Sequence, residues 1–144
     1  MLKKFPKFEY QTDEKIELHS LCQKSDLWML VVSLRSFLFH SGLRPKIIIH
    51  DDGSIDEKSA DLIESKFSGL KVLRKEDADK MIENFPGLTE KVKNYRFRGH
   101  IMIMQFIDIF LLSGAENIIV YDSDILFYKK PDEVVKFFEE IEPP

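Results

Sequence analysis

The stretch Asn117-Ile118-Ile119-Val120-Tyr121-Asp122-Ser123-Asp124-Ile125-Leu126-Phe127-Tyr128 decides how the rest of the chain is interpreted. An apolar run rich in β-branched residues ends in two aspartates one residue apart, and a second apolar run follows. A short apolar run bounded by polar residues is typical of a buried central strand. Open α/β sheets bind ligands at the carboxyl ends of their strands, so we expect these carboxylates to lie in a binding cleft.

The two aspartates, Asp122 and Asp124, suit a divalent cation. In a turn after the strand they can converge on one point, where two unpaired carboxylates would repel each other. They would then need a proton, a basic partner or a cation, and ligands that are all oxygen favour Mg²⁺ or Mn²⁺. The sequence therefore predicts a metal site here. The plainer alternative is that both aspartates cap a turn or the next helix.

Composition indicates an ordinary globular domain. The chain has 144 residues, enough for one domain with a real core, and is 44% hydrophobic and 32% charged. A net charge of −4 argues against a nucleic-acid-binding surface. The single cysteine, Cys22, suits a reducing compartment, and no run is long enough for a membrane span. We therefore expect a soluble, cytoplasmic protein.

Patterns typical of strands alternate with patterns typical of helices, which predicts an α/β fold with a parallel sheet. Residues 88–98 are polar and poorly periodic and are expected to be mostly loop. Helix 100–113 is almost wholly apolar and must be covered on most sides. If that cover is missing, we expect an exposed apolar patch and self-association. Strands are expected at 16–22, 47–50, 71–74 and 117–121, and helices at 27–41, 55–68, 76–85, 100–113 and from 131 onward.

The tripeptide Asp122-Ser123-Asp124 after a hydrophobic strand resembles the Asp-x-Asp motif of nucleotide-sugar glycosyltransferases with the A-type fold, and the following stretch 126–131 is similar to the family's continuation. The resemblance implies a Rossmann-like, mostly parallel sheet in the order 3-2-1-4, with helices on both faces. It also implies that Asp122 and Asp124 hold Mn²⁺ or Mg²⁺ against the diphosphate of a nucleoside-diphosphate sugar, with a UDP-sugar as the expected donor.

A second stretch, His50-Asp51-Asp52-Gly53-Ser54-Ile55-Asp56, is similar to the Asp-Asp-Gly-Ser-x-Asp segment of the same enzymes. The resemblance implies that Asp51 or Asp52 binds the nucleoside, and the sequence leaves that choice open. A carboxylate is suited to a ring N–H or to ribose hydroxyls. A plain strand-to-helix turn, capped by Ser54, explains the same residues.

Further residues are expected near the donor. The basic cluster 95–100 precedes an apolar helix, whose N-terminus favours anions, although a solvated loop explains the cluster equally well. Trp28 is expected in the core. Those assigned to nucleotide-sugar binding are Cys22, Ser25, Asp51, Asp52, Arg98, Tyr121 and Ser123.

The resemblance covers nearly all of residues 1–144 but only the N-terminal, donor-binding half of the family's domain, so we expect the domain to be incomplete at its C-terminus. No catalytic residue is assigned, and catalysis by these residues alone is in doubt. A non-catalytic nucleotide-binding or interaction domain remains an alternative. A phosphotransferase that uses Asp-x-Asp, or a receiver domain, is disfavoured because the acidic motifs lie too late in the chain.

Overall fold

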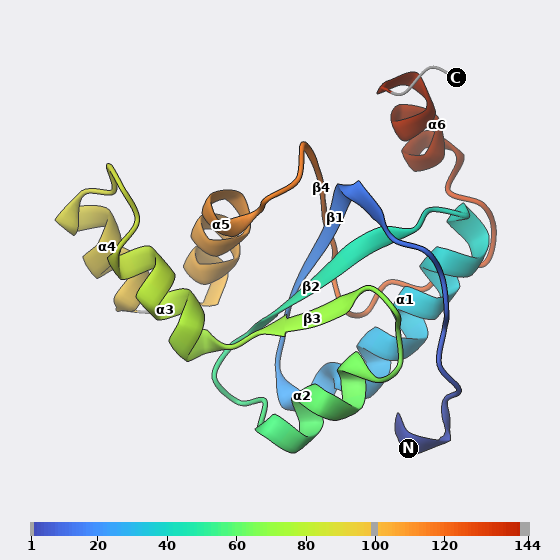
Figure 1. Cartoon of the computed structure of the whole chain (residues 1–144), viewed down its shortest axis with the longest axis horizontal. Coiled ribbons are helices and arrows are strands. Elements are labelled where there is room, and N and C mark those ends of the chain that lie inside the picture. The colour runs from blue at the N-terminus through green and yellow to red at the C-terminus, as the bar shows by residue number, and fades with distance from the viewer. Residues whose placement is uncertain (1, 99–100, 142–144) are drawn as a thin grey trace.

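One parallel sheet organises the molecule. The structure, a computed structural model, describes residues 2–98 and 101–141. In this part of the chain the strands are β1 (Asp13–Cys22), β2 (Pro45–Asp51), β3 (Leu70–Leu73) and β4 (Asn117–Val120). They pair in parallel in the order β3-β2-β1-β4 (Figure 1), which confirms the predicted α/β fold and its strand order.

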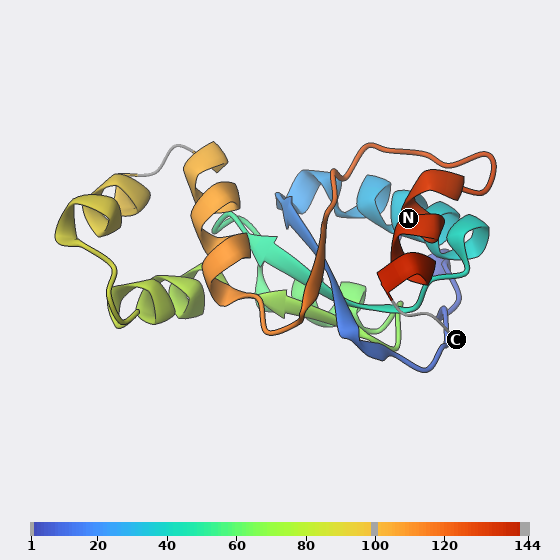
Figure 2. The ribbon, with the colours of Figure 1, turned by 90° about the horizontal axis from the view of Figure 1, so that it is seen from above.

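Helices lie on both faces of this sheet (Figures 1 and 2). Two short 3₁₀ turns precede α1 along the chain. The helical elements are η1 (Leu2–Lys4), η2 (Lys24–Asp26), α1 (Leu27–Ser41), α2 (Glu57–Glu64), α3 (Lys75–Glu83), α4 (Glu90–Phe97), α5 (Ile101–Leu112) and α6 (Asp132–Ile141). The predicted helix 100–113 corresponds to α5, and its first predicted residue, His100, lies outside the described residues. No helix within the described ranges is both long and apolar enough to cross a membrane.

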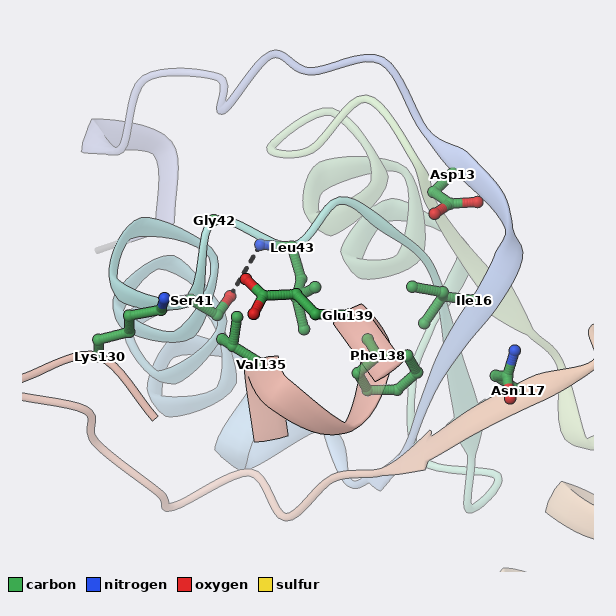
Figure 3. A pocket seen from close by; sticks show the side chains of 10 residues that line it. All are labelled: Asp13, Ile16, Ser41, Gly42, Leu43, Asn117, Lys130, Val135, Phe138 and Glu139. Carbon is green, nitrogen blue, oxygen red and sulfur yellow. Dashed lines mark hydrogen bonds between the residues drawn. The ribbon is translucent and has the colours of Figure 1, made fainter. Parts of the chain in front are cut away.

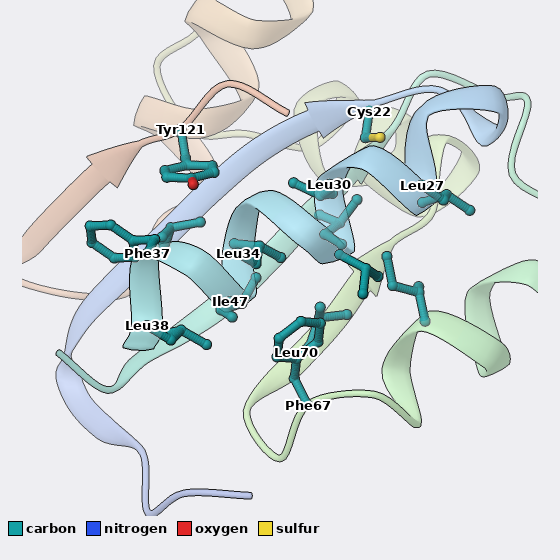
Figure 4. Packing of buried hydrophobic residues seen from close by; sticks show 14 of the residues in the cluster. Cys22, Leu27, Leu30, Leu34, Phe37, Leu38, Ile47, Phe67, Leu70 and Tyr121 are labelled. Atoms are coloured by element: carbon teal, nitrogen blue, oxygen red, sulfur yellow. The ribbon is translucent and has the colours of Figure 1, made fainter. Parts of the chain in front are cut away.

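One face of the sheet is apolar and packs against α1 and α2. Alternate side chains of a strand point to opposite faces, so Leu18 and Ile47 face the helices and are fully buried. Figure 4 shows Leu34 and Leu38 of α1 packed over Ile47, with Leu70 of β3 beside them. This continuous core holds the carboxyl ends of the strands in place.

The opposite face is polar and buried as well. Glu17 and His19 of β1 are only 4% and 1% exposed, and His50 of β2 is 2% exposed. Two groups at the end of α5 contact this face, since the Ser113 hydroxyl and the Gly114 amide both donate to Glu17 Oε2 at 2.9 Å. The polar alternation of β1 therefore marks a second packed face and not a solvated one.

The strand that ends in the Asp-x-Asp sequence is an edge strand, and the prediction of a buried central strand was wrong. Among the described residues β4 pairs only with β1, and its side chains are half-buried, with Val120 47% exposed. Periodicity shows that a segment is a strand but does not show how many neighbours it has. Its number of partners depends on what packs beside it.

The predicted loop at 88–98 contains a helix, α4. Thr89 begins it by accepting a hydrogen bond from the Val92 amide at 3.4 Å. The helical pattern was hidden because the side chain that α4 buries is the charged Arg96, which is 1% exposed. A search for apolar residues at helical spacing misses a helix that packs through an ion pair.

Two local predictions were also wrong. Helix α2 is capped by Asp56, which accepts from the Ser59 amide at 2.8 Å, whereas Ser54 accepts from the Lys24 amide. Trp28 is 47% exposed and lies outside the core. Ser54 does not cap the helix because the loop between β1 and α1 lies against the loop after β2, where the Lys24 amide uses the Ser54 hydroxyl.

Helix α5 is covered on one side only. Its side chains at Phe106 and Phe110 are 67% and 59% exposed and stack on each other with ring centroids 6.4 Å apart. The apolar helix thus presents the exposed patch that was expected for the case in which its cover is missing. Self-association through this patch stays a prediction.

Candidate functional site

The loops that follow β1, β2 and β4 open from the same edge of the sheet. Cys22 at the end of β1 is in register with Asp51 at the end of β2. On the other side of β1, His19 is in register with Val120, and the Tyr121 amide donates to the His19 carbonyl at 2.8 Å. The segments starting at Asp52 and Asp122 therefore flank the end of β1.

Aspartates from three loops lie close enough to Cys22 to influence its thiol. Burial of the thiol, which is 3% exposed, raises its pKa to about 12, and the charges of Asp26, Asp52 and Asp122 add to the rise. The Sγ atom donates to the Gln23 carbonyl at 3.3 Å. A thiol that stays protonated is not a nucleophile at neutral pH. Cys22 is instead the point near which acids from both neighbouring loops gather.

Asp51 holds the turn after β2. Its Oδ1 accepts from the Gly53 amide at 2.8 Å and from the Ile55 amide at 2.9 Å, and its Oδ2 lies 3.3 Å from Arg74 Nε. The side chain is 2% exposed. Because both oxygens already have partners inside the protein, Asp51 shapes the loop.

Asp52 lies beside it and is partly exposed. Its Oδ1 accepts from the Ser54 amide at 2.9 Å. Gly53, between Asp52 and Ser54, has φ 101°, a conformation that favours glycine. A Cβ there would meet Lys75 Cδ at 2.9 Å, so the turn lies close against α3. Asp52 lines a pocket of about 180 Å³ together with Lys75, Arg96, Phe97, Ile101 and Met104.

Asp122 and Asp124 lie exposed in the loop after β4. Asp122 Oδ1 accepts from the Ser123 amide at 2.8 Å, and Asp124 borders a separate hollow of about 160 Å³ beside Trp28. Over the ranges that the structure describes, no three His, Cys, Asp or Glu side chains gather to hold a metal. A cation here would have carboxylate oxygens from the protein and further ligands from water or a bound molecule, as Mg²⁺ commonly does.

The remaining residues with a predicted role lie in different surroundings. Ser25 is exposed and donates to Asp26 at 2.9 Å, and Arg98 is exposed at the end of α4. Ser123 is 9% exposed. The ring of Tyr121 is buried in the core, where its hydroxyl is 2.7 Å from Ser33 Oγ and its ring stacks on Phe127 with centroids 6.4 Å apart.

The cluster 95–100 was expected near the donor, but only Arg98 was assigned to the site, whereas Arg96 and Phe97 line the pocket at Asp52. Arg96 Nε and Nη2 donate to the two oxygens of Asp108 at 2.9 and 2.6 Å, and Nη1 pairs with Asp79. The sequence did carry a signal, because Asp108 is the one charged residue within the apolar helix. A buried carboxylate needs a charged partner, and Arg96 precedes it on the neighbouring helix.

A larger pocket of about 350 Å³ lies at the opposite edge of the sheet, between α6, the end of α1 and the starts of β1 and β4 (Figure 3). Its floor is formed by Ile16, Val135 and Phe138. Ligands of open parallel sheets bind at the carboxyl ends of the strands. We therefore place the candidate site at the Asp52 and Asp122 edge.

The parallel sheet with the strand order β3-β2-β1-β4 and helices on both faces defines a Rossmann-like α/β fold. The chain is similar in structure to the mannosyltransferase Ktr4p from S. cerevisiae, with a TM-score of 0.51 and 13% sequence identity. The similarity covers 95% of this chain and 41% of the yeast chain, so this chain spans less than half the length of that protein. At this identity the similarity shows the fold alone. No protein-family model and no curated protein sequence matches the chain.

Proposed function

We propose that the chain is the donor-binding part of a metal-dependent glycosyltransferase that uses a nucleoside-diphosphate sugar, with UDP-sugar as the donor. The observation that carries the proposal is the arrangement at the carboxyl edge, where Asp52 and Asp122 approach the end of β1 from its two neighbours. The glycosyltransferase-like fold supports it. The lone cysteine is our reason to keep the cytoplasm as the expected compartment.

In this proposal Asp122 and Asp124 hold Mn²⁺ or Mg²⁺, and Asp52 binds the nucleoside. The set of exposed carboxylate oxygens is the kind that hard cations prefer. When bound, the cation would act as a Lewis acid and stabilise charge on the departing diphosphate. We choose Asp52 over Asp51 because the oxygens of Asp51 are already used by the turn and by Arg74.

Binding without catalysis is the second candidate. It is kept as a candidate because the similarity to the yeast protein, at 13% identity, shows the fold alone. Both candidates predict that the protein binds UDP in the presence of the metal. They differ in whether the protein hydrolyses or transfers the sugar of a UDP-sugar, which a release assay for UDP measures.

Asp124→Ala is expected to weaken Mn²⁺-dependent UDP binding by about tenfold or more, because it removes one of two protein ligands of the cation. Isothermal titration of UDP with Mn²⁺ and with EDTA measures the effect. The matched control is Glu116→Ala, which removes an exposed acid at the other end of β4. UDP binding that is the same with EDTA, or unchanged in Asp124→Ala, would contradict the metal assignment.

Asp51→Ala is expected to affect mainly stability, whereas Asp52→Ala is expected to affect mainly UDP binding. Asp51→Ala should lower the free energy of unfolding by about 2 kcal/mol, because the Gly53 and Ile55 amides lose their acceptor. Asp52→Ala should change it by less than about 0.5 kcal/mol and should weaken UDP binding. Urea denaturation and UDP titration of both variants separate these roles. A stable Asp51→Ala protein that no longer binds UDP would reverse the assignment.

A further inference from the structure

The only tryptophan of the chain lies on the surface, between two hollows. Trp28 of α1 is 47% exposed and lines a hollow of about 410 Å³ together with Leu2 and Leu62. It also lines the hollow of about 160 Å³ with Ile125 and Leu126, which are 40% and 43% exposed. Because the two hollows share Trp28, these five side chains form one partly exposed apolar strip, called here the Trp28 strip.

Lysines border the Trp28 strip at the end where Leu2 lies. Lys3 and Lys24 line the same hollow as Leu2, and Lys4 is exposed next to Lys3. Residues 1–8 contain three lysines and no acid, in a chain whose net charge is −4. Neither Lys3 nor Lys4 forms an ion pair with a residue that the structure describes. Their charges are therefore available to an anion outside the protein.

The acids around the Trp28 strip leave this positive end in place. Lys24 pairs with Asp56, so the charges of these two side chains cancel. Asp61 of α2 lines a different hollow, and the described residues that line the larger hollow at Trp28 include no carboxylate. Asp124 borders the strip at its opposite end. The surface is thus apolar in the middle and positive at the lysine end, against the sign of the whole chain.

The surface of an anionic membrane has the chemistry that complements this arrangement. Tryptophan rings favour the boundary between lipid headgroups and acyl chains, where an apolar ring is buried and its N–H stays wet. Each lysine close to an anionic bilayer strengthens binding by about fivefold. A soluble anion would use the lysines alone, whereas a bilayer also covers the apolar side chains of the strip.

We propose that the Trp28 strip, together with Lys3 and Lys4, binds the protein peripherally to membranes that contain anionic lipid. The attachment is reversible, because the side chains are only partly exposed and two free lysines supply the attraction. Asp124 lines the hollow that Trp28 shares with Ile125, so the carboxyl edge of the sheet would lie beside the bilayer. The inference concerns where the protein binds and does not depend on the function proposed above.

The test uses phosphatidylcholine vesicles with and without phosphatidylserine, in EDTA so that no cation can bridge Asp122 and Asp124 to the lipid. Wild type should sediment with the anionic vesicles and not with the neutral ones, and added salt should release it. The emission of Trp28 should shift to shorter wavelength and be quenched by brominated lipid. Because the chain has no other tryptophan, this signal reports on the proposed surface alone.

Two pairs of variants locate the contact. Lys3→Glu with Lys4→Glu should weaken binding to anionic vesicles by about twentyfold or more. The matched control is Lys129→Glu with Lys130→Glu, which makes the same charge change at two neighbouring exposed lysines after β4. Trp28→Ala should weaken sedimentation by about tenfold, because one ring no longer enters the interface. Phe106→Ala removes a ring from α5 that is 67% exposed and should leave sedimentation unchanged.

Several results would overturn the inference. Wild type that does not sediment with anionic vesicles, or that sediments equally with neutral ones, would contradict it. So would equal binding by the two double-lysine variants. If Phe106→Ala lost binding and Trp28→Ala did not, the membrane contact would belong to α5. If heparin displaced the vesicles and Trp28→Ala bound them as wild type does, the lysines would form a site for soluble polyanions. UDP binding, measured without vesicles, tests the proposed function separately.

Discussion

Asp108→Ala is expected to lower the free energy of unfolding by about 3–5 kcal/mol, the usual effect of removing one partner of a buried ion pair. The side chains of Arg96 and Asp108 are only 1% and 2% exposed, and the pair joins α4 to α5. The loss arises because Arg96 keeps its charge in a buried position, with Asp79 as its remaining acid. Urea denaturation followed by circular dichroism measures it.

Two further variants show that the loss comes from the unpaired charge. Replacing both partners, as Arg96→Met with Asp108→Leu, should recover most of the stability, because no buried charge is then left. Lys80→Met breaks the exposed pair with Asp77, whose side chains are 73% and 59% exposed, and should change stability by less than about 1 kcal/mol. If Asp108→Ala were no more destabilising than Lys80→Met, the ion pair would not hold α4 in place.

The protein is expected to lose stability steeply as the pH falls from about 6.5 toward 4.5, through two buried histidines. His19 Nδ1 and His50 Nε2 lie 2.9 Å apart beneath α5. Burial lowers the pKa of His50 from 6.5 to about 3, with the charges of His19 and Arg96 adding to this, and burial also lowers the pKa of His19. Both rings are therefore neutral in the folded protein at neutral pH.

Stability falls with falling pH because the unfolded chain takes up more protons than the folded protein. Below pH 6.5 the unfolded chain binds protons at both histidines. The folded protein does not protonate His50 until the pH is near 3, so each pH unit in the window removes about 1.4 kcal/mol through His50. His19 adds a loss of the same sign, because burial lowers its pKa as well. Glu17 adds nothing in this window. Burial would raise its pKa, but hydrogen bonds from Gly114, Ser113 and other neighbours outweigh that effect and bring it from 4.5 to about 2, so its contribution is lost only below about pH 4.5.

Unfolding free energies measured at several pH values between about 7 and 4.5 give the change in stability per pH unit. His50→Gln should reduce the loss over that range by about 2 kcal/mol relative to wild type, because one group that must stay neutral is gone. His40→Gln is the matched control and removes a histidine at the end of α1, outside the buried pair. A wild-type slope equal to that of His50→Gln would mean that His50 is protonated in the folded protein.

Much of the fold was predictable because its determinants are local. The apolar–polar alternation around Leu18, the run of isoleucines at Ile47 and the helical spacing of Leu30, Leu34 and Leu38 lie within single elements. Each element was predicted close to its observed bounds. The position of Asp52 and of the Asp122 loop at the carboxyl edge followed from the same local patterns. In a parallel sheet every strand ends at the same edge, so residues after the strands are brought together without knowledge of the packing.

The contacts between distant elements were not predictable in this way. Helix α4 forms within residues 88–98 because Arg96 pairs with Asp108 and Asp79, and no residue pattern within that segment indicates the pairing. The burial of Glu17 and His19 likewise depends on the end of α5, almost a hundred residues later in the chain. Charged and polar groups become core residues only when a partner from elsewhere satisfies them.

The linear chain was thus sufficient for the strands, most helices and the edge where the acids lie, since these follow from periodicity and from the geometry of parallel sheets. The three-dimensional arrangement was needed to distinguish Asp51, whose oxygens are used in the turn, from Asp52, which faces a pocket. It was also needed to show that Phe97, which was predicted in a loop, lines that pocket. Both distinctions rest on which side chains meet across space, and local periodicity carries no information about that.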